Sequence, residues 1–166
     1  HMVPNADLNR ARLPQTNSFI FSNMVPQHDL FNRGIWARLE SRVRRWAGVA
    51  DGVYVVGGAI FDKDGDGQRD ADDAADLVTS TNRVAIPTHF YKIILHVRPS
   101  GFIDTISFVL PHLDESVGST NPYLRDHIAT IDEIEAVTGI DFFPELPDQR
   151  ETTVEAFRAA GLWNTN

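Results

Sequence analysis

Polar residues that can bind a metal ion and a phosphate gather in one segment, Ser22–Glu40 (SNMVPQHDLFNRGIWARLE). Asn32 precedes an expected helix, where asparagine usually serves only as an N-cap. Glu40 follows two turns later, and helical side chains lean toward the N-terminus, so Glu40 points back toward Asn32. Glu40 can then orient a water on a cation that the Asn32 amide oxygen binds. An amide oxygen with several waters suits Mg²⁺, or Mn²⁺ in its place.

Arginine is concentrated around the same helix. Arg44 lies one turn beyond Glu40, where it can pair with this acid and face a phosphate. Residues 33–45 contain five arginines opposed only by Glu40, and residues 1–50 carry a net charge of +4 in a chain whose net charge is −8. The overall charge argues against a generic nucleic-acid binder. The local charge can nevertheless hold a polyanion, and a solvated helix face is the simpler alternative.

A second cluster, DKDGDGQRDADD at residues 62–73, has the spacing of a calcium loop. Acidic residues occupy positions one, three, five, nine and twelve, and a glycine occupies position six, where a sharp turn is required. Position seven offers its backbone carbonyl. The alternative is a solvated acidic loop without an ion. The expected Ca²⁺ ligands are Asp62, Asp64, Asp66, Gln68, Asp70 and Asp73.

Hydrophobic periodicity indicates the elements that must position these residues. An apolar stripe at three- and four-residue spacing predicts a helix over residues 33–47, capped by Asn32 and ended by Gly48. A capping box and a terminal glycine predict a second helix over residues 131–138, and a third is expected over residues 152–160. Residues 1–18 and 112–122 are expected to be irregular. Strands are predicted over residues 52–61, 83–86, 90–97 and 102–110.

This pattern favours one α+β domain over residues 1–166, with a mixed or antiparallel sheet and flanking helices. The chain has no cysteine, which excludes a thiolate metal site. No apolar run approaches the roughly 20 residues that cross a bilayer, so no membrane partner is expected. Lys92, inside a predicted strand, is assigned no role.

The run SNMVPQ…NRGIWARLE resembles the DNA/RNA non-specific endonuclease family, which includes the Serratia-type secreted nucleases and mitochondrial endonuclease G. The segments VYVVGGAIF, VAIPTHFYKIIL and IDEIEAVTGIDFFPELP are also similar. The resemblance implies a ββα-metal, or His-Me finger, architecture, in which an antiparallel hairpin and a helix hold one cation. It also implies hydrolysis of DNA and RNA, with a histidine as general base and an asparagine as the sole protein ligand of the metal.

By this resemblance, His1 in the opening HMVPNAD matches the general base, and Asn32 matches the metal ligand. Asn23 matches an asparagine near the scissile phosphate, Glu40 the acid behind the metal, and Arg44 a phosphate-facing base. A leading His-Met is also a common cloning remnant, and the sequence leaves the origin of His1 open.

The sequence departs from the family at its start, because the Asp-Arg-Gly that precedes the family's histidine is absent. Residues 1–166 are therefore expected to form the C-terminal portion of the family fold. Residues 62–76 form an insertion whose Ca²⁺ is expected to order a loop beside the Asn32 helix, and a regulatory role for calcium stays open. The alternative function is a calcium-stabilised, catalytically incomplete binding module, or a fragment that needs its N-terminal part or a second chain.

The implied chemistry needs few groups. Histidine, with an ordinary pKa of about 6.5, can take a proton from water at neutral pH, a cation stabilises the developing charge, and arginines hold the non-bridging oxygens. None of these groups reads a base edge, which accounts for weak sequence specificity. DNA and RNA are the expected partners, and a protein inhibitor is a further one. Because weak calcium loops occur outside the cytosol, a secreted or periplasmic location is expected.

Overall fold

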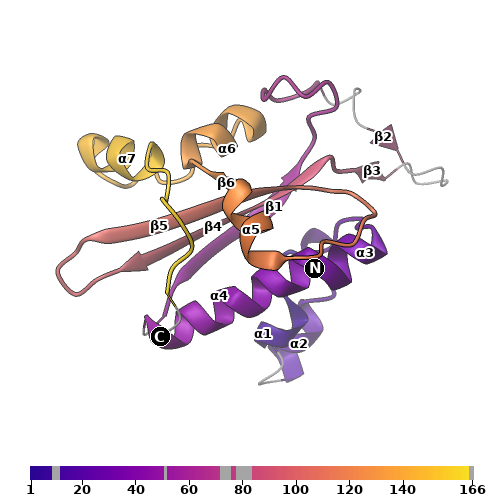
Figure 1. The fold of residues 1–166 in the computed structure, drawn as a ribbon, viewed down its shortest axis with the longest axis horizontal. Helices are drawn as coiled ribbons and strands as arrows, with labels where there is room; N and C mark the ends of the chain where they lie inside the picture. The colour runs from indigo at the N-terminus through magenta and orange to yellow at the C-terminus, as the bar shows by residue number, and fades with distance from the viewer. Residues whose placement is uncertain (9–11, 51, 72–75, 78–83, 165–166) are drawn as a thin grey trace.

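A four-stranded antiparallel sheet, in the order β1-β4-β5-β6, forms the centre of the computed structural model (Figure 1). The model describes residues 1–8, 12–50, 52–71, 76–77 and 84–164. A separate two-stranded sheet pairs β2 (Asp76–Leu77) with β3 (Ala85–Ile86). The strands of the main sheet are β1 (Tyr54–Ile60), β4 (His89–Val97), β5 (Ile103–Pro111) and β6 (Ile128–Ala129). The predicted α+β class is confirmed.

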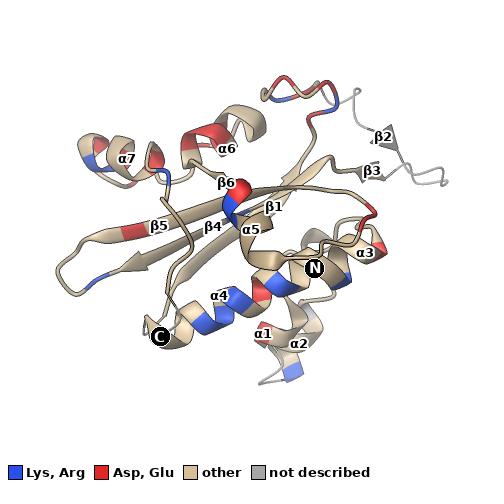
Figure 2. Cartoon of the chain, viewed as in Figure 1, with Lys and Arg blue, Asp and Glu red and all other residues tan. Residues whose placement is uncertain are grey.

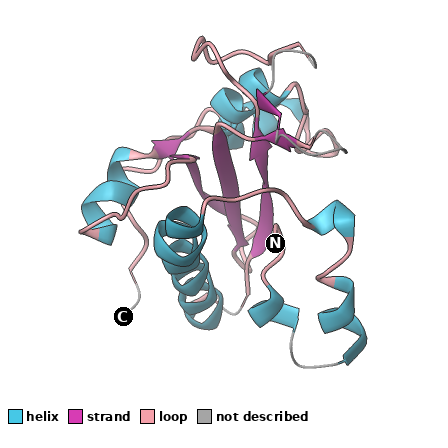
Figure 3. Cartoon of the chain, turned by 90° about the vertical axis from the view of Figure 1, so that its right-hand side faces the viewer, coloured by secondary structure: helices cyan, strands magenta, loops and turns pink. Residues whose placement is uncertain are grey.

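Helices cover both faces of this sheet (Figures 1 and 3). On one face, α3 (Asp29–Phe31) continues through a π-helical turn (Asn32–Trp36) into α4 (Ala37–Val49). On the other face of the sheet lie α6 (Ile131–Thr138) and α7 (Asp148–Glu155). No described helix is long and apolar enough to cross a bilayer. The shorter helices are α1 (Asn5–Leu8), α2 (Arg12–Asn17) and α5 (Thr120–Asp126).

The alternation of side chains along β4 separates two apolar cores. Phe90 and Ile94 face α4, whereas Tyr91 and Ile93 face α6 and α7. The stripe predicted for the arginine-bearing helix is confirmed, because its five members are at most 7% exposed: Ile35, Trp36, Leu39, Val43 and Trp46. The apolar residues of the second helical layer are Ile131, Ile134, Val137 and Val154.

The helix that carries Asn32 begins four residues earlier than predicted, so the assignment of Asn32 as its N-cap was wrong. Asn32 itself has α-helical torsion angles (φ −60°, ψ −50°). The backbone N–H of His28 donates to Nε2 of His112 (2.7 Å), and that of Leu30 donates to Oδ1 of Asp114 (3.3 Å). Both acceptors lie 84 residues further along the chain. The first turn is therefore satisfied by tertiary contacts, which a local pattern does not contain.

Other boundaries also differ from the prediction. Residues 1–18 contain α1 and α2, and α5 occupies part of the segment predicted as a loop. The last helix starts at Asp148, since acidic residues favour a helix N-terminus. The helix over residues 131–138, with its capping box and left-handed Gly139 (φ 68°), is confirmed. Of the predicted strand 83–86, β3 covers residues 85–86, and Arg83 lies outside the described residues.

His112 supplies a test of how the start of α3 is held to the sheet. Its ring bonds the carbonyl oxygen of Pro87 through Nδ1 (2.8 Å) and accepts from His28 through Nε2. Replacing His112 with Phe keeps the ring packing and removes both bonds, which should lower the free energy of unfolding by about 1–3 kcal/mol. Urea titration at about pH 7.5 measures this loss.

The difference in stability between the wild type and this variant should depend on pH. Burial lowers the pKa of His112 in the folded chain, so the wild-type advantage is present above about pH 6.5 and is lost as the pH falls below that value. A difference between wild type and variant that is unchanged at about pH 5 would contradict this role.

Candidate active site

Asn23 anchors the first residues of the chain. Its Oδ1 accepts the N–H of Val3 (2.7 Å), and its Nδ2 donates to the carbonyl oxygens of Val3 (3.0 Å) and Ser18 (2.8 Å). The N–H of Met2 also donates to the Asn23 carbonyl oxygen (2.9 Å). These contacts occupy both polar atoms of the side-chain amide. The structure thus gives Asn23 a positioning role beside His1, and its predicted place at the scissile phosphate stays a prediction.

His1 carries an unused ring nitrogen. Its ring lies edge-on to that of Phe19, with centroids 4.8 Å apart. Its Nε2 is buried and has no hydrogen-bond partner within the described residues. Met2 and Val3, the two residues after His1, line the same cavity as Glu40 and Lys92. A buried imidazole nitrogen without a partner is uncommon, and histidine is the side chain whose ordinary pKa suits proton exchange near neutral pH.

Asn32 lies on the exposed side of its helix, at the start of the π-helical turn. Its side-chain amide forms no hydrogen bond in the described part of the chain. Two residues later, the backbone of Gly34 leaves helical geometry (φ −95°, ψ −111°). Such turns inside helices occur frequently at functional sites. An accessible amide oxygen with no internal partner fits a hydrated Mg²⁺-type cation.

Glu40 lies half-buried behind this surface. It lines a cavity of about 120 Å³ that residues 2–4, Asp7 and Lys92 also line. Burial raises the pKa of Glu40, whereas the charges of Lys92 and Arg44 oppose the shift. Glu40 is therefore a carboxylate whose charge depends on the two cations near it.

Lys92 is a charged residue of this site that the sequence pattern did not single out. It is 2% exposed, and its Nζ lies 4.3 Å from the centroid of the Trp36 ring. Burial lowers the pKa of Lys92, and the carboxylates of Glu40 and Asp7 oppose that shift. A lysine at an alternate position in the run FYKIIL, on the same face as Phe90, was the available signal.

Arg44 is tied to its neighbours. Its guanidinium donates to Oδ1 of Asp7 (2.9 Å) and to Oγ of Ser41 (3.0 Å), and the Arg44 side chain remains 38% exposed. The exposed part faces solvent beside Glu40, as the sequence predicts for a phosphate-facing base, but that role stays a prediction.

Three further arginines line a hollow of about 440 Å³ between α4 and the start of α5: Arg38, Arg42 and Arg45. The guanidinium of Arg38 donates to the Val117 carbonyl oxygen (2.7 Å), and that of Arg42 donates to Asn121. Figure 2 shows the resulting basic stripe along α4. Arg38 and Arg42 thus hold the start of α5 in place, and all three arginines line the hollow.

The acidic loop is folded around its carboxylates in the described residues. Oxygens of Asp62, Asp64 and Asp66 lie within 4.8 Å of one another. Asp62 accepts the backbone N–H groups of Gly65 (2.9 Å) and Gly67 (3.2 Å). Gly67 has φ +75°, which a residue with a side chain rarely adopts, and it occupies the expected turn position. Asp73, the predicted twelfth residue, lies outside the described residues.

The predicted location of this loop was wrong. It lies at the α6 end of the molecule rather than beside the Asn32 helix (Figure 1). The Cδ of Arg69 lies against Gly139, at the end of α6. The N–H of Asp62 donates to Oγ1 of Thr88 (2.9 Å), which holds the loop to the sheet. The side of the molecule on which this loop folds depends on such contacts, which the spacing of its acidic residues does not encode.

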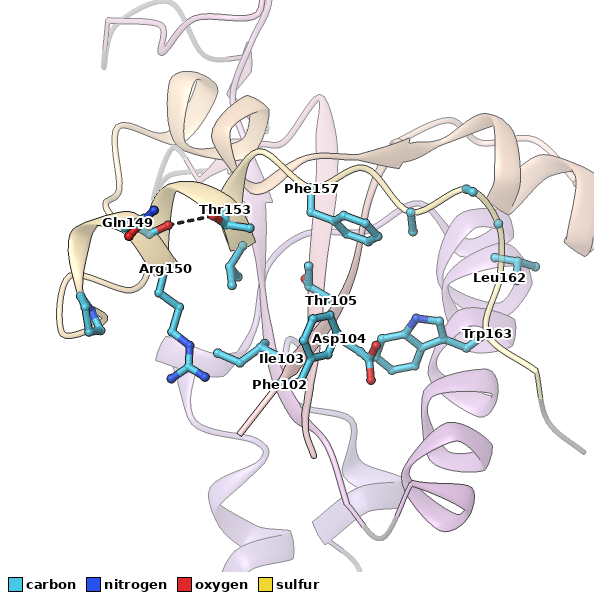
Figure 4. A pocket seen from close by; sticks show the side chains of 15 residues that line it. Phe102, Ile103, Asp104, Thr105, Gln149, Arg150, Thr153, Phe157, Leu162 and Trp163 are labelled. Atoms are coloured by element: carbon cyan, nitrogen blue, oxygen red, sulfur yellow. Dashed lines mark hydrogen bonds between the residues drawn. The ribbon is translucent and has the colours of Figure 1, made fainter. Parts of the chain in front are cut away.

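A larger cavity, about 880 Å³, lies elsewhere, between β5, α7 and the C-terminal segment (Figure 4). Its walls are mostly apolar, and its charged groups are engaged. Asp104 pairs with Arg98 (3.0 Å between Oδ1 and Nη2), and Arg150 donates to the Gly101 carbonyl oxygen. None of the predicted site residues lines this cavity.

Comparison with known proteins identifies the family. The sequence pattern of the DNA/RNA non-specific endonucleases matches residues 1–149. The chain belongs to this family. Nuclease EXOG, mitochondrial, of Homo sapiens is 30% identical over 88% of this chain and 39% of its own length. The family predicted from the Ser22–Glu40 segment is therefore confirmed.

Two phosphodiesterases are also similar to this nuclease-family chain. Ectonucleotide pyrophosphatase/phosphodiesterase family member 3 of Bos taurus is 31% identical over 82% of the chain and 18% of its own length. Venom phosphodiesterase of Naja atra is 28% identical over 84% of the chain and 19% of its own length. The chain thus spans about a fifth of these phosphodiesterases and about two fifths of EXOG.

Replacing Asn23 and replacing Asn32 in this endonuclease-family chain should have different effects on the free energy of unfolding. Asn23→Ala removes the three side-chain hydrogen bonds that hold Val3 and Ser18, and should lower the free energy of unfolding by about 1–3 kcal/mol. Asn32→Ala removes an exposed, unbonded amide, and should change it by less than about 0.5 kcal/mol. Chemical denaturation of both variants provides the comparison. Equal losses would show that Asn32 has a structural partner.

Proposed function

We propose that this chain is the metal- and substrate-binding part of an endonuclease that hydrolyses phosphodiester bonds in both DNA and RNA. Asn32 holds one Mg²⁺ or Mn²⁺, and His1 is the general base. Membership of the endonuclease family supports the reaction class. The observation that carries the assignment is the accessible, unbonded amide of Asn32 at the π-helical turn of the arginine-bearing helix.

His1 begins the reaction by accepting a proton from water on a ring nitrogen. The water oxygen attacks phosphorus, and the bond to the 3′ oxygen breaks. When bound, the cation supplies positive charge that stabilises the phosphoryl group and the leaving oxygen. Glu40 orients the hydration of the site from its half-buried position, and Lys92 beneath it favours the charged carboxylate. Asn23 keeps the segment that follows His1 in register with these groups.

Substrate binding follows the basic stripe. Arg38, Arg42 and Arg45 line the hollow beside α5, and the exposed part of Arg44 continues the positive surface. Backbone phosphates are common to DNA and RNA, so contacts of this kind bind both without reading sequence. Binding should therefore weaken steeply as salt concentration rises.

A calcium-stabilised binding module without catalysis is the second candidate. Two observations favour it: the amide of Asn23 is fully used by the backbone, and Arg44 is paired with Asp7. A module of this kind would retain nucleic acid on the arginine stripe without cutting it. The chain matches about a fifth of the length of two phosphodiesterases, as a binding module within a longer protein would.

Asn32→Ala distinguishes the two functions. If Asn32 holds the cation, this variant should lose Mg²⁺-dependent cleavage of plasmid DNA and of RNA by about 100-fold or more, with unchanged binding of an oligonucleotide in EDTA. Asn164→Ala, which removes another exposed asparagine, is the matched control. Wild-type cleavage by the Asn32 variant would remove the metal-ligand role. Binding without cleavage by the wild-type chain would favour the binding module.

For the acidic loop we propose a structural Ca²⁺ site formed by Asp62, Asp64, Asp66, Asp70 and Asp73, with the carbonyl of Gln68. The clustered oxygens of the first three and the positive φ of Gly67 support it. A weak site of this kind functions where calcium is abundant, which supports a secreted or periplasmic location.

If the loop binds calcium structurally, Ca²⁺ at about 100 times its dissociation constant should raise the free energy of unfolding by about 2.7 kcal/mol. Asp66→Asn should lose most of this gain, whereas Asp126→Asn, an exposed acid outside the loop, should keep it. Thermal and chemical denaturation with and without Ca²⁺ measure the difference. An equal gain in both variants would assign the calcium effect to another site.

A further inference from the structure

Five carboxylates converge between α6 and α7, on the face of the sheet opposite the arginine stripe. Asp132 and Glu135 project from one side of α6, Glu151 and Glu155 from one side of α7, and Asp141 lies in the loop between them. Oxygens of Asp132, Glu135 and Glu155 lie within 4.8 Å of one another, as do those of Asp141, Glu151 and Glu155. Glu155 is shared by both groups, which places it at the centre of the cluster.

Glu155 has the least favourable surroundings of the five carboxylates. It is only 7% exposed, and its Oε1 has no hydrogen-bond partner in the described part of the chain. Its neighbour Val154 belongs to the apolar core beneath α7. A buried carboxylate oxygen without a donor is unfavourable, and like charges nearby add to the cost. The geometry therefore favours a positively charged occupant or a proton.

In the absence of a cation, the surroundings of Glu155 favour its protonated form. Burial, together with the nearby carboxylates of Glu135, Glu151, Asp132 and Asp141, raises the pKa of Glu155 to about 7. A cation would bind in competition with this proton, so binding should release protons near neutral pH.

The two arginines that lie in or just after α7 are engaged elsewhere: Arg150 donates to the carbonyl oxygen of Gly101. Arg158, which follows α7, donates to the Glu133 carboxylate and to the carbonyl oxygen of Ile128. Glu135 accepts the N–H of Phe142 through Oε1 (2.8 Å), which draws the residue after Asp141 toward α6. Neither arginine is bonded to a carboxylate of the cluster among the described residues.

The donor set defines the class of cation. All five side chains offer oxygen, with no imidazole or thiolate, which disfavours zinc and copper. The donors come from two helices and a loop, and the exposed Asp132 and Asp141 leave room for water. Ca²⁺ accepts six to eight oxygens in irregular geometry, whereas Mg²⁺ demands an octahedron.

We propose that this cluster, the α6–α7 carboxylate site, binds a divalent cation of the calcium class with Glu155 as the shared ligand. The cation joins α7 to α6. The site is separate from both Asn32 and the 62–73 loop.

The test uses the whole chain with the loop disabled by Asp62→Asn, Asp64→Asn and Asp66→Asn. Calorimetric titration at about pH 7.5, up to about 10 mM Ca²⁺, should still detect one bound ion, because weak protein sites have dissociation constants of roughly 10⁻⁴–10⁻³ M. Adding Glu155→Gln should weaken this binding by about tenfold or more and remove the rise in thermal midpoint that Ca²⁺ causes. Without Ca²⁺, the Glu155→Gln variant should be the more stable, since one buried like charge is gone.

Glu145→Gln in the same background is the matched control, because it removes an exposed carboxylate outside the cluster and should bind like the background. Absence of calcium uptake by the loop-disabled chain, or equal uptake with Glu155→Gln, would overturn the proposal and leave Glu155 as a protonated acid. If the loop-disabled chain does not fold, the wild-type chain should bind one more Ca²⁺ than Glu155→Gln alone. Equal stoichiometry in that comparison would also overturn it.

Discussion

The contact of Lys92 with Trp36, together with its attraction to the Glu40 carboxylate, constrains how the arginine-bearing helix lies on the sheet. A lysine ammonium at 2% exposure is stable only where an aromatic face and a carboxylate compensate its lost hydration. Sliding α4 by one turn would move both partners away and leave the charge buried alone. The helix therefore has one favourable register, and that register decides which way Asn32, on the same helix, faces. The candidate active site depends on a buried charge that performs no chemistry itself.

The same register joins the N-terminal segment to the site. Residues 2–4 close the small cavity above Lys92, and Asn23 holds them there through hydrogen bonds to Val3. Asp7 adds a second link by pairing with Arg44. The unpartnered nitrogen of His1 is thus placed by contacts from three parts of the chain. In the proposed reaction these contacts limit the motion of the general base, which favours proton transfer.

Opposite charges are separated onto the two faces of the sheet. Arginines follow α4 on one side, and acidic side chains gather on α6 and α7 on the other (Figure 2). A chain of net charge −8 can therefore present a local surface that attracts a polyanion. The repulsion between like charges is concentrated on the acidic face. One buried oxygen of Glu155 there has no hydrogen-bond donor among the described residues. The proposed cations at the acidic loop and at the α6–α7 carboxylate site would offset this repulsion without approaching Asn32.

The amino-acid sequence alone determined the family, the α+β class, the apolar stripe of α4 and the capping box at Thr130. All of these depend on residues close together in the chain, because the spacing of such residues fixes which of them share a helix face or a cap. Only the tertiary structure decided where the Asn32 helix begins, because His112 and Asp114 satisfy its first N–H groups from 84 residues away. It also showed Asn23 as an anchor, Lys92 as part of the site and the acidic loop against α6. These features depend on which strands and helices meet, and the free energy of burying a charge or an N–H group is set by the partner it finds there.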